Sequence, residues 1–163
     1  MNIVKTRIGL LAALLAAPAS GCTEPNTSAA IIMRSLEERR ANSIVGQAIE
    51  VSGERPKAGR TLKVDGGELQ EDFLIGGGPY GIAYLTEEEL AKLGDAIPKH
   101  DPNSEQLRLI RPSDDAIVLV LYHHQYRYDA GDAHSVSVVT VEMKLEKDVV
   151  DFMTHVVKQR AHQ

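Results

Sequence analysis

Residues 116–128, Ala-Ile-Val-Leu-Val-Leu-Tyr-His-His-Gln-Tyr-Arg-Tyr, form the most strand-like stretch of the sequence. β-Branched and aromatic side chains dominate this stretch, and such residues favour extended backbone. A second stretch of similar composition, 133–145, follows after the turn-forming sequence Asp-Ala-Gly-Asp at 129–132. This pattern predicts that 116–128 and 133–145 pair as an antiparallel hairpin. Because 117–121 carries apolar side chains on both faces, this part of the hairpin is expected to lie at the centre of a sheet.

The predicted hairpin gathers tyrosine, histidine and serine on one face, because alternate residues of a strand point to the same side. This candidate binding face consists of Tyr122, His124, Tyr126, Tyr128, Ser135 and Ser137. Tyrosine and histidine combine an apolar ring with a polar end, which suits a partly hydrated, concave surface that binds a ligand. The alternative interpretation is an ordinary sheet face that the C-terminal helix covers. The face holds no charged anchor that would define a ligand class.

Glycines and capping residues divide the segment before the hairpin. Residues 28–45 predict a helix that begins at the N-cap residue Ser28 and stops at Gly46. Short strand-like runs separated by glycines follow at 48–52, 61–65, 72–75 and 80–85. Thr86 and Glu89 then have the spacing of a capping box, which predicts a short helix that Gly94 ends.

The C-terminal residues predict a further helix. Residues 147–160 place valine, phenylalanine and methionine on one broad side, and their acidic residues come before their last basic residues, as the helix dipole favours. With a loop at 95–105, these elements predict an α+β fold in a single domain, residues 29–163. We expect an antiparallel sheet with the C-terminal helix packed on it, plus an N-terminal helix and one short central helix.

The first residues show the features of a signal peptide in the usual order. Lys5 and Arg7 precede an uninterrupted apolar run at 8–17. A helix of this length is only ~15 Å long, about half the hydrocarbon core of a bilayer. The run is therefore too short for a membrane span and suits the apolar core of a signal peptide. Small residues follow at 18–21, and then Cys22.

The sequence Ala-Ser-Gly-Cys at 19–22 resembles the lipobox of bacterial lipoproteins, in which cleavage precedes a cysteine that becomes lipidated. Ala19 stands where that family usually has leucine. The resemblance implies a signal peptide at 1–21, acyl chains such as palmitate on Cys22, and a lipid-tethered linker at 22–28. Cys22 is also the only cysteine of the chain, so it has no partner for an intramolecular disulfide.

Two questions of location stay open in the sequence. Residues 17–19, Ala-Pro-Ala, also fit an ordinary signal peptidase site, whose use would release a soluble protein. The residue after the cysteine is Thr23, which by resemblance to the enterobacterial sorting rule implies the outer membrane, facing the periplasm.

The mature chain is expected to be acidic. Removing 1–21 takes two basic residues and no acidic residue from totals of 18 and 23, which leaves 16 against 23 and a net charge of −7. Such a surface is a poor partner for nucleic acid, whose binding depends on basic patches.

Two motifs resemble a metal site and a phosphate-binding loop, but their predicted geometry excludes these roles. His123 and His124 are adjacent in a predicted strand, so their imidazoles would point to opposite faces and could not share one metal ion. The glycine-rich run at 76–79 precedes strand-like residues and lacks the lysine of a phosphate loop, so it predicts a turn. No nucleophile elbow or zinc-ligand spacing occurs either. We therefore expect no catalytic residues, no metal site and no cofactor.

The sequence thus predicts an envelope lipoprotein with a non-enzymatic role in binding a protein partner or stabilising an envelope assembly. The alternative is a periplasmic carrier of a small molecule or lipid that uses the sheet face with Tyr122, His124 and Tyr126.

The anchor can be tested by the intact mass of the protein isolated from bacterial membranes. We expect a mature chain that begins at Cys22 and carries the added mass of acyl chains, and we expect Cys22→Ala to abolish membrane attachment. A mature chain that begins at Ser20 with an unmodified thiol would refute the lipid anchor.

Overall fold

The computed structural model describes residues 31–101, 104, 106–113, 115–131 and 136–161, and its fold class is α+β, as predicted. Its elements follow the chain as β1 (Met33–Ser35), α1 (Glu38–Val51), β2 (Pro56–Ala58), β3 (Thr61–Val64), β4 (Gly67–Gln70), β5 (Phe73–Ile75), β6 (Tyr80–Leu85), α2 (Glu87–Leu93), η1 (Gly94–Ala96), β7 (Arg108–Ser113), β8 (Ala116–Tyr122), η2 (His123–Gln125), β9 (Arg127–Asp129) and α3 (Val136–Arg160).

A five-stranded mixed sheet in the order β2-β5-β6-β8-β7 forms the centre of the domain. The two central strands, β6 and β8, run parallel, with Tyr80 opposite Ile117 and Leu85 opposite Tyr122. The other three pairs of this sheet are antiparallel, in agreement with the predicted sheet type. Two separate ribbons complete the strands: β1 pairs with β9, and β3 pairs with β4.

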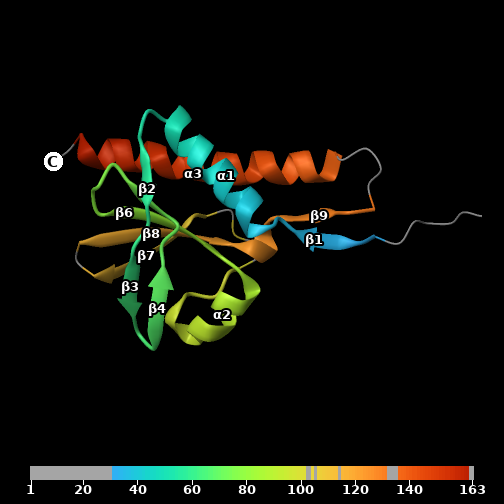
Figure 1. Cartoon of the computed structure of the whole chain (residues 1–163), viewed down its shortest axis with the longest axis horizontal. Helices are drawn as coiled ribbons and strands as arrows, with labels where there is room; N and C mark the ends of the chain where they lie inside the picture. Colours follow the sequence, from blue (N-terminus) through green and yellow to red (C-terminus); the bar gives the residue numbers. More distant parts are fainter. Residues whose placement is uncertain (1–30, 102–103, 105, 114, 132–135, 162–163) are drawn as a thin grey trace, which may run out of the picture.

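Both faces of the central strands are covered (Figure 1). Helices α1 and α3 lie on one face, where they bury Ile82, Tyr84, Leu119 and Leu121 together with apolar residues of both helices. The β3–β4 hairpin and α2 lie on the other face, where Leu69 and Leu93 pack against Ala83, Leu85, Val118 and Val120. This two-sided burial is why the stretch 117–121 is apolar throughout, and its predicted central position is confirmed.

The predicted hairpin of 116–128 with 133–145 is wrong. Strand β8 ends at Tyr122, the turn η2 follows, and residues 127–129 pair as β9 with β1 near the N-terminus. The expected second strand belongs to α3 from Val136 onward. Its valines favour strand conformation locally, but the helix is stabilised by an apolar stripe that packs on the sheet and on α1. The predicted helix at 147–160 is confirmed, although α3 begins eleven residues earlier.

The N-terminal helix lies later in the chain than predicted. Helix α1 includes Gly46, which was expected to stop it, and takes up most of 48–52, which was expected to form a strand. Its buried residues recur at helical spacing on both sides of Gly46: Ala41, Ile44, Val45, Ala48 and Ile49. This stripe outweighs the low helix propensity of one glycine. The expected N-cap, Ser28, lies outside the described residues.

Several local predictions are confirmed. The capping box is present, since the Thr86 hydroxyl accepts a hydrogen bond from the Glu89 amide and the Glu89 carboxylate accepts one from the Thr86 amide. Gly94 caps the end of α2, and the glycine-rich run at 76–79 forms the turn between β5 and β6. The runs at 61–65, 72–75 and 80–85 correspond to β3, β5 and β6. None of the helices in the described part of the chain has the length and apolarity needed to cross a membrane.

Gly59 and Gly46 differ in the space around them. A Cβ atom added at Gly59 would lie 1.9 Å from the backbone oxygen of Glu71, because the chain just after β2 is hydrogen-bonded to the chain just before β5. A Cβ atom added at Gly46, inside α1, would first meet the Phe73 ring at 3.7 Å, an ordinary contact.

We therefore expect Gly59→Ala and Gly46→Ala to change stability in opposite directions. Gly59→Ala forces two backbone segments apart and should lower the free energy of unfolding by more than about 2 kcal/mol. Gly46→Ala should raise it by up to about 1 kcal/mol through helix propensity. Urea denaturation of both variants measures these changes, and equal effects in the two would contradict the packing at Gly59.

Candidate functional site

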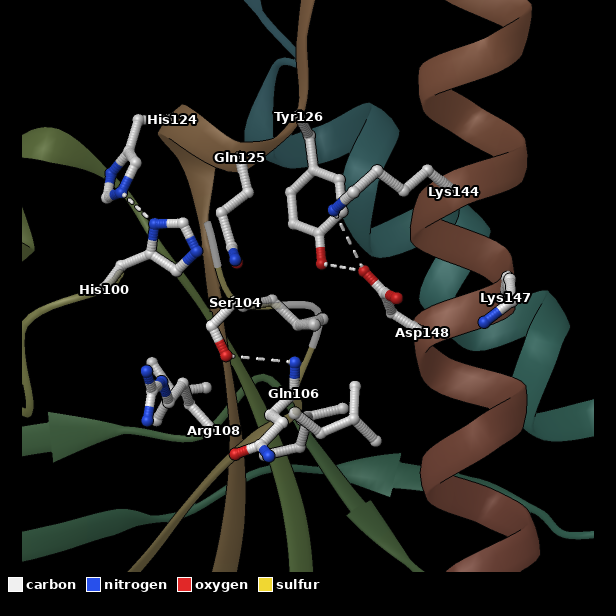
Figure 2. A pocket seen from close by; sticks show the side chains of 14 residues that line it. His100, Ser104, Gln106, Arg108, His124, Gln125, Tyr126, Lys144, Lys147 and Asp148 are labelled. Carbon is white, nitrogen blue, oxygen red and sulfur yellow. Dashed lines mark hydrogen bonds and ion pairs between the residues drawn. The ribbon is translucent and has the colours of Figure 1, made fainter. Parts of the chain in front are cut away.

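A cavity of about 600 Å³ lies between α3, the turn η2 and the loop that precedes β7 (Figure 2). The sheet creates this space because β7 begins at Arg108 opposite Val120, so the last residues of β8 extend beyond the edge strand. Leu107, Leu119 and Leu121 belong to its lining; Leu107 is partly exposed and supplies apolar surface, whereas Leu119 and Leu121 are buried in the core behind it. Its volume is within the range of about 300–1,000 Å³ that small-molecule sites occupy.

One wall of the cavity is fixed by a hydrogen bond between Tyr126, the residue after η2, and a side chain of α3. The buried Tyr126 hydroxyl donates to Asp148 Oδ2 at 2.8 Å, and Lys144 Nζ reaches the same oxygen at 3.3 Å (Figure 2). The Lys144 ammonium also lies 4.5 Å from the centre of the Tyr126 ring, a cation–π distance. Burial, and then the neighbouring Asp148 carboxylate, raise the pKa of Tyr126, so its hydroxyl stays protonated as a donor.

The opposite wall carries a pair of histidines. His100 Nδ1 and His124 Nε2 lie 3.2 Å apart and share one hydrogen bond (Figure 2). Partial desolvation is the main cause that lowers the pKa of both imidazoles, of which His100 is half-buried and His124 is exposed, and nearby cations lower it further. Tyr122 supports this wall, because its ring packs against both histidines and its hydroxyl donates to the Pro98 carbonyl.

The predicted binding face is not one surface in the structure. Tyr122 ends β8 and is buried, whereas His124 and Tyr126 belong to the turn that follows and line the cavity. Tyr128 is half-buried in β9, and Ser137 lies in α3, where its hydroxyl accepts a hydrogen bond from the Asp129 amide. Ser135 lies outside the described residues. The prediction that these residues share one face was wrong because it depended on an extended strand through 128 and a partner strand at 133–145.

The structure therefore brings His124 and Tyr126 to one cavity but with partners that the sequence did not indicate. The polar lining also includes His100, Ser104, Gln106, Arg108, Gln125, Lys144, Lys147 and Asp148. They come from a loop, an edge strand, a turn and a helix, so no local spacing relates all of them, and only the tertiary fold could identify them.

Two other titratable side chains have neighbours outside the cavity. His123 packs edge-on against the His124 ring, with ring centres 5.6 Å apart, and its Nε2 lies 3.9 Å from Glu87. Asp72 is held by the Tyr84 amide at 2.7 Å and by the Asn42 side chain at 2.9 Å. Among residues 31–161 that the structure describes, no group of three or more histidine, cysteine or acidic side chains has the arrangement of a metal site.

The cavity thus combines apolar surface with hydrogen-bond donors from three separate parts of the chain, which equips it to bind a ligand. No protein-family model, no curated protein and no solved structure matches this chain. Its function has to be inferred from the residues of the site.

The histidine pair predicts how stability depends on pH. Because the folded state lowers the pKa of His100 and His124, the unfolded chain takes up their protons first, at about pH 6.5. Their contribution to stability is complete above that pH and is lost as pH falls toward their lowered values. Between about pH 7.5 and about pH 5.5, His124→Gln should therefore lose less unfolding free energy than the wild type.

Denaturant unfolding across this pH range measures the effect, with His155→Gln as the control because His155 is exposed on α3. The buried Asp72 also affects how the free energy of unfolding depends on pH. Its contribution is the same in all three proteins, so it cancels in the comparison. A pH profile of His124→Gln that coincides with the wild-type profile would contradict the assignment.

Proposed function

We propose that this protein is a lipid-anchored, non-enzymatic protein of the bacterial envelope whose domain binds a small molecule in the cavity beside β7. The resemblance of residues 19–22 to a lipobox supports the anchor. The single observation that carries the binding role is the convergence of polar groups from loop, turn and helix on one cavity that also has apolar lining.

The state of the polar groups favours binding over catalysis. The acid and hydroxyl of one wall, Asp148 and Tyr126, are bonded to each other, and the raised pKa of Tyr126 makes it a poor base at neutral pH. On the opposite wall the histidines are bonded to each other. These bonds fix the shape of the cavity, as a preorganised binding site requires.

A protein-binding role is the second candidate, and exposed apolar side chains on α3 and near β1 favour it. Val139 and Met143 are four residues apart on α3, with 51% and 64% of their surface exposed. Ile31 and Ile32 are 73% and 50% exposed at the start of the described chain. Apolar residues that gather on a surface often mark a contact with another protein.

A tryptophan placed in the cavity separates the two candidates. Ser104 lines the cavity and is only partly exposed, so Ser104→Trp should fill the space. Ser43→Trp, at an exposed position of α1, makes the same chemical change far from the cavity lining. The chain has no other tryptophan, so each variant also carries a single fluorescent reporter.

We expect the full-length protein, isolated from the cells that produce it, to retain a small molecule in native mass spectra. Ser43→Trp should retain the molecule, and Ser104→Trp should lose at least about nine-tenths of it, since even a 1.4 kcal/mol loss of binding is tenfold. Equal amounts of the molecule in both variants, or none in the wild type, would refute the small-molecule role. Co-isolation of a stoichiometric protein partner in its place would support the second candidate.

A further inference from the structure

Arg108 is the one side chain of the cavity lining whose cationic head has a buried nitrogen without a partner in the described chain. Its Nε is inaccessible and makes no hydrogen bond there, and the ion pairs of residues 31–161 that the structure describes do not include it. A buried guanidinium nitrogen without an acceptor costs free energy. Because this nitrogen is inaccessible, a ligand oxygen reaches it only when the neighbouring side chains move, and the bond then removes that cost.

A second nitrogen without a partner belongs to another residue of the cavity lining. His100 Nε2 is buried and makes no hydrogen bond within the described residues. Because Arg108 is opposite Val120 in the antiparallel pair, it shares the sheet face of Tyr122, and the His100 ring lies 5.5 Å from the Tyr122 ring. Figure 2 shows His100 and Arg108 together on the same side of the cavity.

The histidine pair allows His100 Nε2 to act as a donor. When the His124 Nε2–H donates to His100 Nδ1 at 3.2 Å, neutral His100 carries its own proton on Nε2. An acceptor next to Arg108 would favour this tautomer. Two donors without partners, one of them cationic, then belong to the lining of the same cavity.

The other cations of the cavity lining already have acidic partners on α3. Lys144 lies 3.3 Å from Asp148, and Lys147 lies 2.7 Å from Asp151. Asp148 is the one carboxylate among the described lining residues, and it also accepts a hydrogen bond from Tyr126. Among the cations of this described lining, Arg108 is therefore the one that these ion pairs leave for a ligand.

We propose that the ligand of this cavity carries an anionic group, a carboxylate or a phosphate, that accepts hydrogen bonds from Arg108 and His100, with an apolar body against the partly exposed Leu107. This inference rests on the proposed small-molecule role and names the class of ligand. A charge-assisted bond to arginine is the contact that selects an oxyanion over a neutral group of the same shape.

Three small probes test the ligand class on the full-length protein in nanodiscs, with empty nanodiscs as background. Benzoate and phenyl phosphate carry the two oxyanions, and benzamide is the neutral counterpart of benzoate. Dissociation constants come from ligand-observed saturation-transfer NMR on the wild type, Arg108→Gln, Arg108→Lys and Ser104→Trp. Arg111→Gln is the matched control, since Arg111 is exposed on the same strand and the change in charge is identical.

We expect the wild type to bind benzoate or phenyl phosphate at least about tenfold more tightly than benzamide, the ratio that corresponds to 1.4 kcal/mol. The better of the two anions identifies the group. Arg108→Gln should bring the ratio close to one, Arg108→Lys should keep part of it, and Arg111→Gln should leave it unchanged. Retention of the full ratio in Arg108→Gln would overturn the proposal.

The outcomes also separate this inference from the proposed function. Equal binding of all three probes that Ser104→Trp abolishes would refute the anionic class and support the small-molecule role. Absence of binding by all three probes to the wild type would overturn the inference together with the proposed cavity function. Thermal unfolding of each variant checks that its domain is folded. If Arg108→Gln does not fold, Arg108→Lys still tests the proposal.

Discussion

The parallel pairing of β6 with β8 is the interaction on which the rest of the structure depends. Both strands are buried on both faces, so their backbone hydrogen bonds lie away from water and their side chains hold two separate apolar clusters together. Parallel neighbours need a long connection, and the chain from Thr86 to Ser113 supplies it with α2, a loop and the edge strand β7. The loop that borders the cavity therefore exists because of this crossover.

The cavity is a consequence of unequal strand lengths. β8 continues beyond the start of β7, and α3 crosses the space that remains. The bond from Tyr126 to Asp148 fixes the distance between the turn and the helix, while Tyr122 orders the histidine side. Apolar packing thus sets the outline of the cavity, and a small number of buried polar groups sets its chemistry.

The sequence predicted well those features that short segments determine. The capping box at Thr86 and Glu89, the glycine turn before β6 and the apolar side of the C-terminal helix each depend on neighbours within a few residues. The position of 117–121 at the centre of the sheet also followed from its composition, because only strands covered on both faces are apolar throughout.

Long-range pairing explains what the sequence did not predict. Residues 136–145 are rich in valine and favour a strand by propensity, yet they form helix because α1 and the sheet offer an apolar surface at helical spacing. The same error placed Tyr122, Tyr126 and Ser137 on one face. Arg108 and His100 could not have been identified, since neither belongs to a motif and their proximity arises only when β7 aligns with β8.

The β1–β9 ribbon determines how mechanical load would reach the cavity. In the described chain β1 pairs with β9, and the next residue, Leu36, donates its amide hydrogen to the Tyr126 carbonyl. Tension applied at the N-terminal end of the domain would therefore be borne first by the backbone bonds of the segment that carries His124 and Tyr126. Such tension would act on the wall of the cavity before it reached the central sheet.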